Sequence, residues 1–299
     1  MLKIPDSWSD KYQYDLFKEL GNKFYDKWES ELEEQDKGAV VSQIKEFEKD
    51  ARLILDKTIP TGILSGYYEL DQKIEGFDPG ELIVISGATG TGKTLFALNM
   101  IMNSFLDGMY PVLIFTLEMT KPQITSRIIQ ILESDNKLKL KDLPIFFYSS
   151  KNEPTIPRMS KAIIEMKEKY GIALVMIDHL HYFSRSIQNQ IAELGILTRE
   201  IKRIAVNEKL PILLLAQPKK KYTSSEPELD DIKGASDITQ DADTVIQLQR
   251  DVMNAIKNNL LNVYITKNRN KGHIGMTEMV IEPKTWRLRS EEKKYFNND

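Results

Sequence analysis

Short apolar runs alternate with longer amphipathic segments along this chain from about residue 58 onward. Runs of four to six apolar residues are typical of buried strands, and apolar residues recurring every three or four positions are typical of helices. We predict strands at 82–86, 112–116, 145–148, 173–177, 212–216, 244–248, 261–266 and 279–281. We predict helices at 95–106, 121–134, 158–170 and 191–208.

This alternation predicts an α/β fold. Near-continuous apolar strands separated by helices favour a mostly parallel β-sheet with helices on both faces. The connections between the last predicted strands are shorter, which indicates an antiparallel extension at one edge. We find no internal repeat.

Residues 1–57 have a different texture, because they are rich in charged and aromatic residues. The runs 12–20 and 41–49 have the spacing of amphipathic helices. The segment is too small and too charged to form a strong core alone, so we expect it to pack on its own domain or on a neighbouring chain. We therefore divide the chain into a helical N-terminal extension, 1–57, and a larger domain, 58–299.

The bulk composition narrows the class of protein. The chain has 299 residues, 41% of them hydrophobic, and a net charge of −3, so any nucleic-acid surface must be local or built by several subunits. It has no cysteine and only three histidines, which excludes disulfides, thiol chemistry and a cysteine-based zinc site. No run is long enough to span a membrane and the N-terminus is no signal peptide, so we expect a soluble, cytoplasmic protein.

A phosphate-binding loop is the most informative motif. Residues 87–94 fit G-x-x-x-x-G-K-[ST], directly between a predicted strand and a predicted helix. Backbone N–H groups of such a loop and the helix N-terminus bind phosphate oxygens, Lys93 reaches the β- and γ-phosphates, and the Thr94 hydroxyl holds Mg²⁺. We expect all eight residues to contact the nucleotide: Gly87, Ala88, Thr89, Gly90, Thr91, Gly92, Lys93 and Thr94.

Three polar residues follow the ends of other predicted strands. In open α/β sheets, ligands bind beyond the carboxyl ends of the strands. Glu118 follows one strand, Asp178 a second and Gln217 a third. Hydrolysis of a phosphoanhydride needs an oriented water and neutralised charge. We assign Glu118 to the attacking water, Asp178 to the metal and Gln217 to sensing the γ-phosphate.

The motifs together resemble one family, the motor domain of DnaB-like hexameric replicative helicases, which are RecA-type ATPases. The resemblance covers about residues 58 to 290. It rests on the entry to the phosphate loop (61–82), on 116–119 around Glu118 and on 175–179 around Asp178. It rests above all on 231–243 and on 266–275, which distinguish this family from other RecA-like ATPases.

The resemblance implies further roles. Arg269 would be an arginine finger that acts in the ATP site of the adjoining subunit, with Lys267 beside it on the γ-phosphate. Arg250 would stack on the nucleotide base. The activity implied is ATP hydrolysis coupled to translocation on single-stranded DNA and to duplex unwinding during replication, by a homo-oligomer, expected to be a hexameric ring.

The same resemblance places DNA contacts in the segment after Gln217. Phosphate contacts by lysines, backbone N–H groups and a serine would give sequence-independent binding in a central channel. The residues concerned are Lys219, Lys220, Lys221, Lys233, Gly234 and Ser236. A second loop, 184–190, is a weaker candidate. A primase, polymerase or loader would be the protein partner.

Two departures and two alternatives remain open. Pro218 and a lysine run stand where the family usually has an Asn-Arg pair or a leucine, and no aromatic is evident near Ile281 to close the base pocket, so ATP or another nucleoside triphosphate fits. A RecA- or RadA-like recombination ATPase is one alternative, and a helicase loader or KaiC-like regulatory ATPase is the other. Unwinding, joint-molecule formation and DNA-independent ATPase activity would distinguish them.

Overall fold

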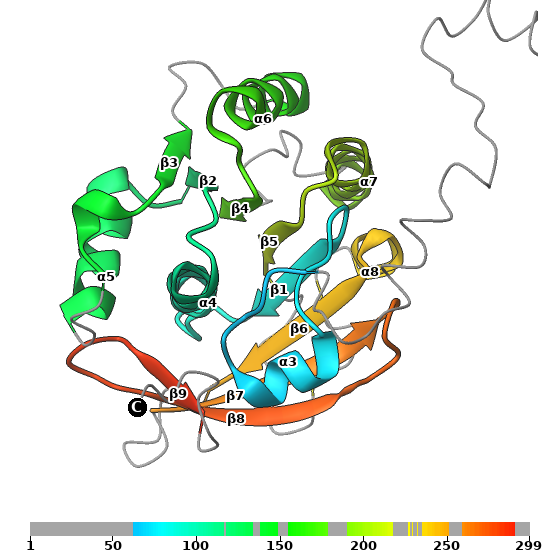
Figure 1. Cartoon of the computed structure of the whole chain (residues 1–299). Helices are drawn as coiled ribbons and strands as arrows, with labels where there is room; N and C mark the ends of the chain where they lie inside the picture. The colour runs from blue at the N-terminus through cyan, green and yellow to red at the C-terminus, as the bar shows by residue number, and fades with distance from the viewer. Residues whose placement is uncertain are drawn as a thin grey trace, which may run out of the picture. The chain divides into compact units, whose positions relative to one another are not determined.

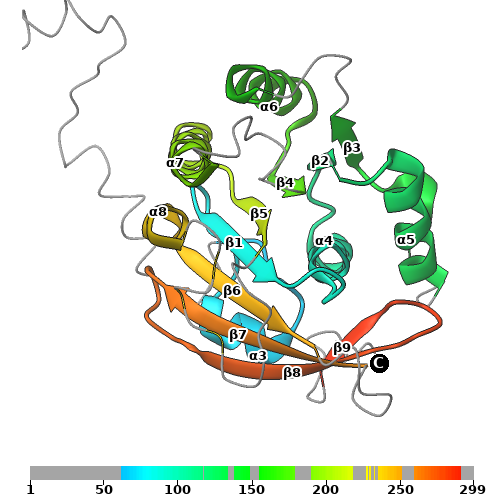
Figure 2. The same ribbon diagram turned by 180° about the vertical axis from the view of Figure 1, so that it is seen from behind.

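A single β-sheet organises the domain. The computed structural model describes residues 62–116, 118–133, 138–148, 155–178, 190–217, 227, 229, 232, 235–250 and 259–290. The predicted N-terminal extension, 1–57, lies outside these residues and stays a prediction. The described strands form a nine-stranded sheet in the order β3-β2-β4-β5-β1-β6-β7-β8-β9 (Figures 1 and 2).

Six strands make the parallel part of the sheet, as the apolar runs predict. In spatial order they are β3 (Ile145–Tyr148), β2 (Val112–Thr116), β4 (Leu174–Asp178), β5 (Ile212–Ala216), β1 (Leu82–Gly87) and β6 (Thr244–Gln249). Every residue of β1, β4 and β5 is buried, which fits strands covered on both faces.

Three antiparallel strands extend the sheet at the β6 side, which confirms the predicted extension. They are β7 (Leu260–Asn268), β8 (Gly275–Ile281) and β9 (Leu288–Ser290). Because β7 runs against β6, its last residue, Asn268, pairs with Thr244, the first residue of β6. The chain therefore leaves β7 at the amino edge of the parallel strands, opposite the edge where Gly87 ends β1.

Helices cover both faces of the sheet. Three helices, α3 (Tyr68–Ile74), α4 (Lys93–Asp107) and α5 (Lys121–Glu133), pack with one face in the larger hydrophobic core. Three others, α6 (Ile156–Tyr170), α7 (Gln190–Glu208) and α8 (Ala235–Asp241), pack with the other face in a second core. A short 3₁₀ helix, η2 (Leu140–Asp142), precedes β3.

The strands separate the two cores by the alternation of their side chains. Ile83 and Ile85 of β1 point into the α4 side, whereas Leu82 and Val84 point into the α7 side. This layered arrangement is the α/β fold expected from the sequence. Within the described part of the chain, no helix is long and apolar enough to cross a membrane.

Candidate functional site

The phosphate loop lies between β1 and α4, as predicted. Gly90 and Gly92 have φ angles of 82° and 111°, which side-chain-bearing residues rarely adopt. A Cβ built at Gly90 would meet nothing within 4 Å, so the conformation, and not the available space, requires glycine there. Gly92 caps α4 and, as a glycine, offers no side-chain acceptor to the first N–H groups of the helix. These N–H groups are the donors that an anion at a helix N-terminus accepts from.

Lys93 folds back over this loop. Its Nζ donates to the carbonyl oxygens of Gly87 at 2.7 Å and Ala88 at 3.3 Å. Burial lowers the pKa of Lys93, and the charges of Glu118 and Asp178 act in the opposite direction. The ammonium group is thus held by neutral carbonyl groups at the loop, with two carboxylates in its electrostatic field.

Thr94 and Asp178 meet beside Lys93. The Thr94 hydroxyl donates to Asp178 Oδ2 at 2.9 Å. Asp178 is 1% exposed, and its Oδ1 has no hydrogen-bond partner among the described residues. Burial raises the pKa of Asp178 to about 6, although the Thr94 hydrogen bond lowers it. A buried carboxylate oxygen without a donor, next to a hydroxyl, is a suitable pair of oxygen ligands for a hard cation.

Glu118 and Gln217 lie at the same edge of the sheet. β2 and β4 pair so that Thr116 is opposite Asp178, and Glu118 is two residues beyond Thr116. The Thr116 hydroxyl donates to the Met119 carbonyl oxygen and closes a turn around Glu118. Glu118 is exposed, and its charge influences both Lys93 and Asp178. Gln217 directly follows β5, the strand between β4 and β1, and is half-buried.

Arg250 also belongs to this edge. It follows the last residue of β6, and Leu248 of that strand pairs with Gly87 at the start of the phosphate loop. Burial lowers the pKa of the half-buried Arg250. The sequence-predicted nucleotide residues therefore converge on the carboxyl edge of adjacent strands.

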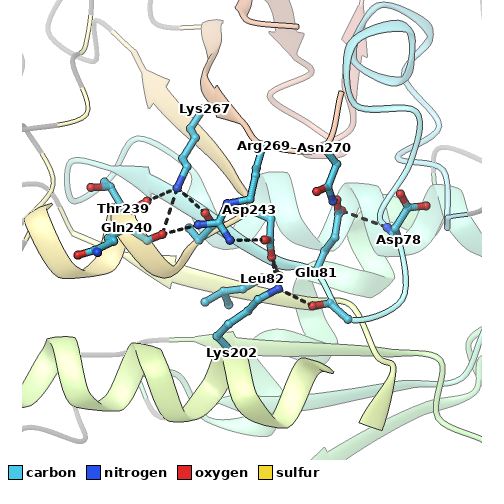
Figure 3. Close-up of polar contacts among 12 residues, drawn as sticks. Asp78, Glu81, Leu82, Lys202, Thr239, Gln240, Asp243, Lys267, Arg269 and Asn270 are labelled. Atoms are coloured by element: carbon cyan, nitrogen blue, oxygen red, sulfur yellow. Dashed lines mark hydrogen bonds and ion pairs between the residues drawn. The ribbon is translucent and has the colours of Figure 1, made fainter. Parts of the chain in front are cut away.

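Lys267 and Arg269 lie at the opposite end of the parallel strands, where these strands begin, and they contact α8 of the same chain (Figure 3). Lys267 Nζ donates to the carbonyl oxygens of Thr239 at 2.5 Å and Ala242 at 2.7 Å. Arg269 NH2 donates to the carbonyl oxygen of Gln240 at 2.6 Å. Two cations thus bind the last carbonyl groups of α8, which helix geometry leaves without intrahelical donors.

A buried carboxylate completes this cluster. Asp243 Oδ1 accepts from Arg269 NH1 at 3.1 Å, and its Oδ2 accepts from Lys202 Nζ at 2.5 Å and from the backbone N–H of Leu82 at 2.8 Å. Figure 3 shows the side chains of Lys202 and Arg269 reaching Asp243 from two different elements. Lys202 also donates to the carbonyl oxygen of Gly80 at 2.8 Å.

Comparison with known proteins shows which family has this arrangement. The sequence matches the model of the DnaB-like helicase C terminal domain over residues 62–144 and 130–290. The chain belongs to this family. The fold agrees, because the solved structure of a DnaB-like replicative helicase superposes with a TM-score of 0.70 at 22% identity, over 88% of this chain and 71% of that one.

Curated DnaB-like relatives are longer than this chain. A probable replicative DNA helicase of Trieres chinensis is 28% identical over an alignment of 278 residues, and the match covers 84% of this chain and 59% of the relative. The replicative DNA helicase DnaB of Haemophilus influenzae is 27% identical over an alignment of 250 residues, and the match covers 73% of this chain and 53% of the relative. The chain thus spans between half and three-fifths of the length of these two relatives.

Some predicted residues cannot be placed in this DnaB-like domain. Lys219, Lys220, Lys221, Lys233 and Gly234 lie outside the described residues, and Ser236 is placed only as part of α8. Their assignment to DNA stays a prediction.

Lys202, Asp243, Lys267 and Arg269 are called the cation cluster below. Sequence reasoning missed two of these residues, Asp243 and Lys202. Asp243 was visible only as the end of a family signature. Its partners are 41 and 161 residues away in the chain, so no local pattern connects them.

Proposed function

We propose that this chain is the ATP-hydrolysing motor of a ring-shaped replicative DNA helicase. Its family membership makes a helicase ATPase the expected activity. The single observation that carries the proposal is that the two charged clusters lie at opposite ends of the parallel strands. The cluster at the phosphate loop lies at their carboxyl ends, and the cluster around Arg269 lies at their amino ends. The phosphate loop follows the end of β1, whereas Arg269 is bound at its beginning through Asp243 and Leu82.

This separation means that Arg269 acts on a neighbour if it acts on nucleotide at all. β1 has six residues, and at 3.3 Å per residue its two ends are about 17 Å apart. An arginine side chain cannot cover that distance from the far edge. A head-to-tail contact between copies would bring the Arg269 edge of one to the phosphate loop of the next, and such contacts generate rings when the rotation closes. We infer that the ring is hexameric.

The residues at the carboxyl edge fit ATP and Mg²⁺. Among the described residues no cluster of three or more His, Cys, Asp or Glu could hold a metal alone. Mg²⁺ is usually bound by one or two protein ligands, waters and substrate phosphates, so Thr94 and the unpartnered Oδ1 of Asp178 suffice. A bound Mg²⁺ would neutralise charge on the phosphate oxygens.

The protein's own groups would do the rest of the chemistry. Lys93 would exchange its bonds to the loop carbonyls for bonds to the β- and γ-phosphates, because an ammonium binds an anionic oxygen more strongly than a neutral one. Glu118 would orient the attacking water and accept its proton. Gln217 would contact the γ-phosphate, Arg250 the base, and Lys267 with Arg269 the γ-phosphate of the adjoining subunit.

DNA and protein partners follow from the same proposal. The segment with Lys219–Lys221 and Lys233–Ser236 would contact the phosphates of single-stranded DNA in a central channel, and residues 1–57 would dock on the next subunit. One solved relative concerns the interactions of such a helicase with primase. We infer a primase, polymerase or loader as the partner, and the cytoplasm of a bacterial or phage-infected cell as the site of action.

Two assays on the purified chain test the proposal. ATP turnover should rise when oligo-dT is added, and a forked duplex should be unwound only with ATP and Mg²⁺. Electron microscopy with a non-hydrolysable ATP analogue and oligo-dT should show closed rings. Lys93→Ala should have no measurable turnover, and Lys284→Ala, an exposed lysine elsewhere, should match the unchanged chain. ATP turnover that ignores single-stranded DNA, or filaments in place of rings, would contradict the proposal.

A further inference from the structure

Asp243 lies between Lys202 and Arg269 in the cation cluster, and the proposed ATP hydrolysis does not yet include it. It is 3% exposed, and each of its carboxylate oxygens accepts at least one hydrogen bond from a charged donor. Its backbone also takes part, because its N–H donates to the Leu82 carbonyl oxygen at 2.9 Å and its carbonyl oxygen accepts from the Arg269 N–H at 2.8 Å. Asp243 therefore connects β1, α7 and the end of β7.

The two oxygens of the Asp243 carboxylate have different partners. Oδ2 holds the carboxylate in place, and Oδ1 accepts from Arg269. Oδ2 is fixed by the backbone of Leu82 and by Lys202, both on elements that pack in the sheet and its helical layer. Oδ1 faces Arg269. Since Oδ2 cannot turn away without losing a backbone donor and the half-buried Lys202 ammonium, Oδ1 presents a rigid acceptor to the guanidinium.

Arg269 has little else to fix its direction. Its side chain is 47% exposed, and among the described residues its Nη2 contacts only the last turn of α8, through the Gln240 carbonyl oxygen. An exposed arginine has many rotamers, and ordering one of them costs side-chain conformational entropy. A buried carboxylate that already holds NH1 removes most of that cost before a ligand arrives.

We propose that Asp243 is a positioning residue, which holds the Arg269 guanidinium in the orientation that enters the nucleotide site of the adjoining copy. This inference rests on the proposed split site. It assigns the role to Asp243 and not to α8 alone, because the α8 carbonyl group that binds Arg269 does not connect the guanidinium to β1, whereas Asp243 does. Pre-organised charges contribute most where they need no rearrangement as the reaction occurs.

The test uses Asp243→Asn, which retains an oxygen acceptor for the Leu82 N–H and removes the charge. If Asp243 positions Arg269, turnover at saturating ATP should fall at least tenfold, while the affinity of a fluorescent ATP analogue stays within twofold. The matched control is Arg203→Met, which removes a neighbouring, exposed cation of α7 that pairs with Glu200 and does not contact Asp243. It should keep turnover within twofold of the unchanged chain.

Mixing experiments then show which half of the site Asp243 serves. Glu118→Ala chains have an intact Arg269, and Arg269→Ala chains have an intact phosphate loop. Equal mixing of Asp243→Asn with Glu118→Ala should restore activity at about one interface in four. Mixing Asp243→Asn with Arg269→Ala should restore nothing, because both lack a working finger.

Each other outcome overturns the inference. Restored turnover in the mixture with Arg269→Ala would mean that Asp243→Asn damages its own phosphate loop through β1. Wild-type turnover of Asp243→Asn alone would mean that the salt bridge has no catalytic consequence. The mixture of Arg269→Ala with Glu118→Ala separately tests the shared site. If that mixture regains nothing, the proposed split site fails, and the role of Asp243 fails with it.

Discussion

The hydroxyl of Thr94 donates to Oδ2 of Asp178 across 2.9 Å, and it joins the first turn of α4 to the end of β4. These residues are 84 positions apart in the chain. Their contact places a hydroxyl oxygen and a carboxylate oxygen side by side next to the phosphate loop. It also leaves Asp178 Oδ1 buried and without a donor among the described residues.

Removing the Thr94 hydroxyl or the Asp178 charge should raise the requirement for Mg²⁺. We expect Thr94→Ala and Asp178→Asn to need at least tenfold more Mg²⁺ for half-maximal turnover, and to lose about two powers of ten in rate, because each removes an oxygen ligand or its charge. Mg²⁺ titrations of ATPase activity measure both effects. Thr94→Ser retains the hydroxyl and should behave as the unchanged chain. An unaltered Mg²⁺ dependence in Asp178→Asn would remove Asp178 from the metal site.

Arg269→Ala should separate nucleotide binding from hydrolysis. We expect the dissociation constant of a fluorescent ATP analogue to change less than threefold and turnover to fall by about three powers of ten or more, the effect that arginine fingers have in other nucleotide-hydrolysing proteins. The matched control is Arg289→Ala, since Arg289 is an exposed arginine of β9 that pairs with Glu282. Equal losses in both variants would indicate a general effect of removing surface charge.

The free energy of unfolding should fall as the pH rises between about 4.5 and 7, because Glu81 loses its proton in this range. Burial raises the pKa of Glu81 from 4.5 to about 7. Because the folded chain binds this proton more tightly than the unfolded chain, folding is favoured below pH 4.5, and the advantage is lost as the pH passes 7. Thermal unfolding across this range measures the slope.

Glu81→Gln should reduce that slope and be the more stable form at pH 8. Glu81 accepts hydrogen bonds from the backbone N–H of Asp78 at 3.1 Å and from the side-chain amide of Asn270. The neutral amide removes the cost of a buried charge, and the Asn270 amide can turn to accept from it. The same slope in both proteins would show that another group is responsible.

The lysines after Gln217 should determine the salt dependence of DNA binding. Each Lys219→Ala, Lys220→Ala or Lys221→Ala substitution should reduce the slope of log affinity against log salt by about 0.7 for single-stranded DNA, if each residue contacts one phosphate. The loss should be equal for oligo-dT and for mixed sequences. Fluorescence anisotropy at several salt concentrations measures this. A slope as steep as in the unchanged chain would place these lysines away from the DNA.

The sequence predicted the parallel core well, because burial on both faces demands nearly continuous apolar runs. Strands β2, β3 and β5 have the predicted bounds, β4 begins and ends one residue later than predicted, and the other predicted strands are longer than predicted. β7 reaches Asn268, beyond the apolar run, because Lys267 and Asn268 have polar side chains and still pair with β6 through the backbone. The helix α3 was missed, since only Leu70, Asp71 and Ile74 of its seven residues are buried.

The residues of the candidate site also fall into those that local sequence patterns predict and those that they do not. The phosphate loop and the strand-end residues follow from rules that act within a few positions of a strand. The bonds of Asp243 to Lys202, Leu82 and Arg269 depend on how distant elements pack, and apolar patterns do not encode a buried polar contact. The family signature drew attention to the segment without indicating which of its residues binds the finger.

The opposite-edge arrangement of Gly87 and Arg269 has a consequence for the concentration dependence of the motor. If every site is shared, an isolated copy contains no complete site, and turnover per chain should collapse on dilution even with ATP in excess. A copy that lacks both its phosphate loop and its Arg269 would also silence two sites, its own and the one it completes. A small fraction of defective chains would then act as a dominant inhibitor of the assembly.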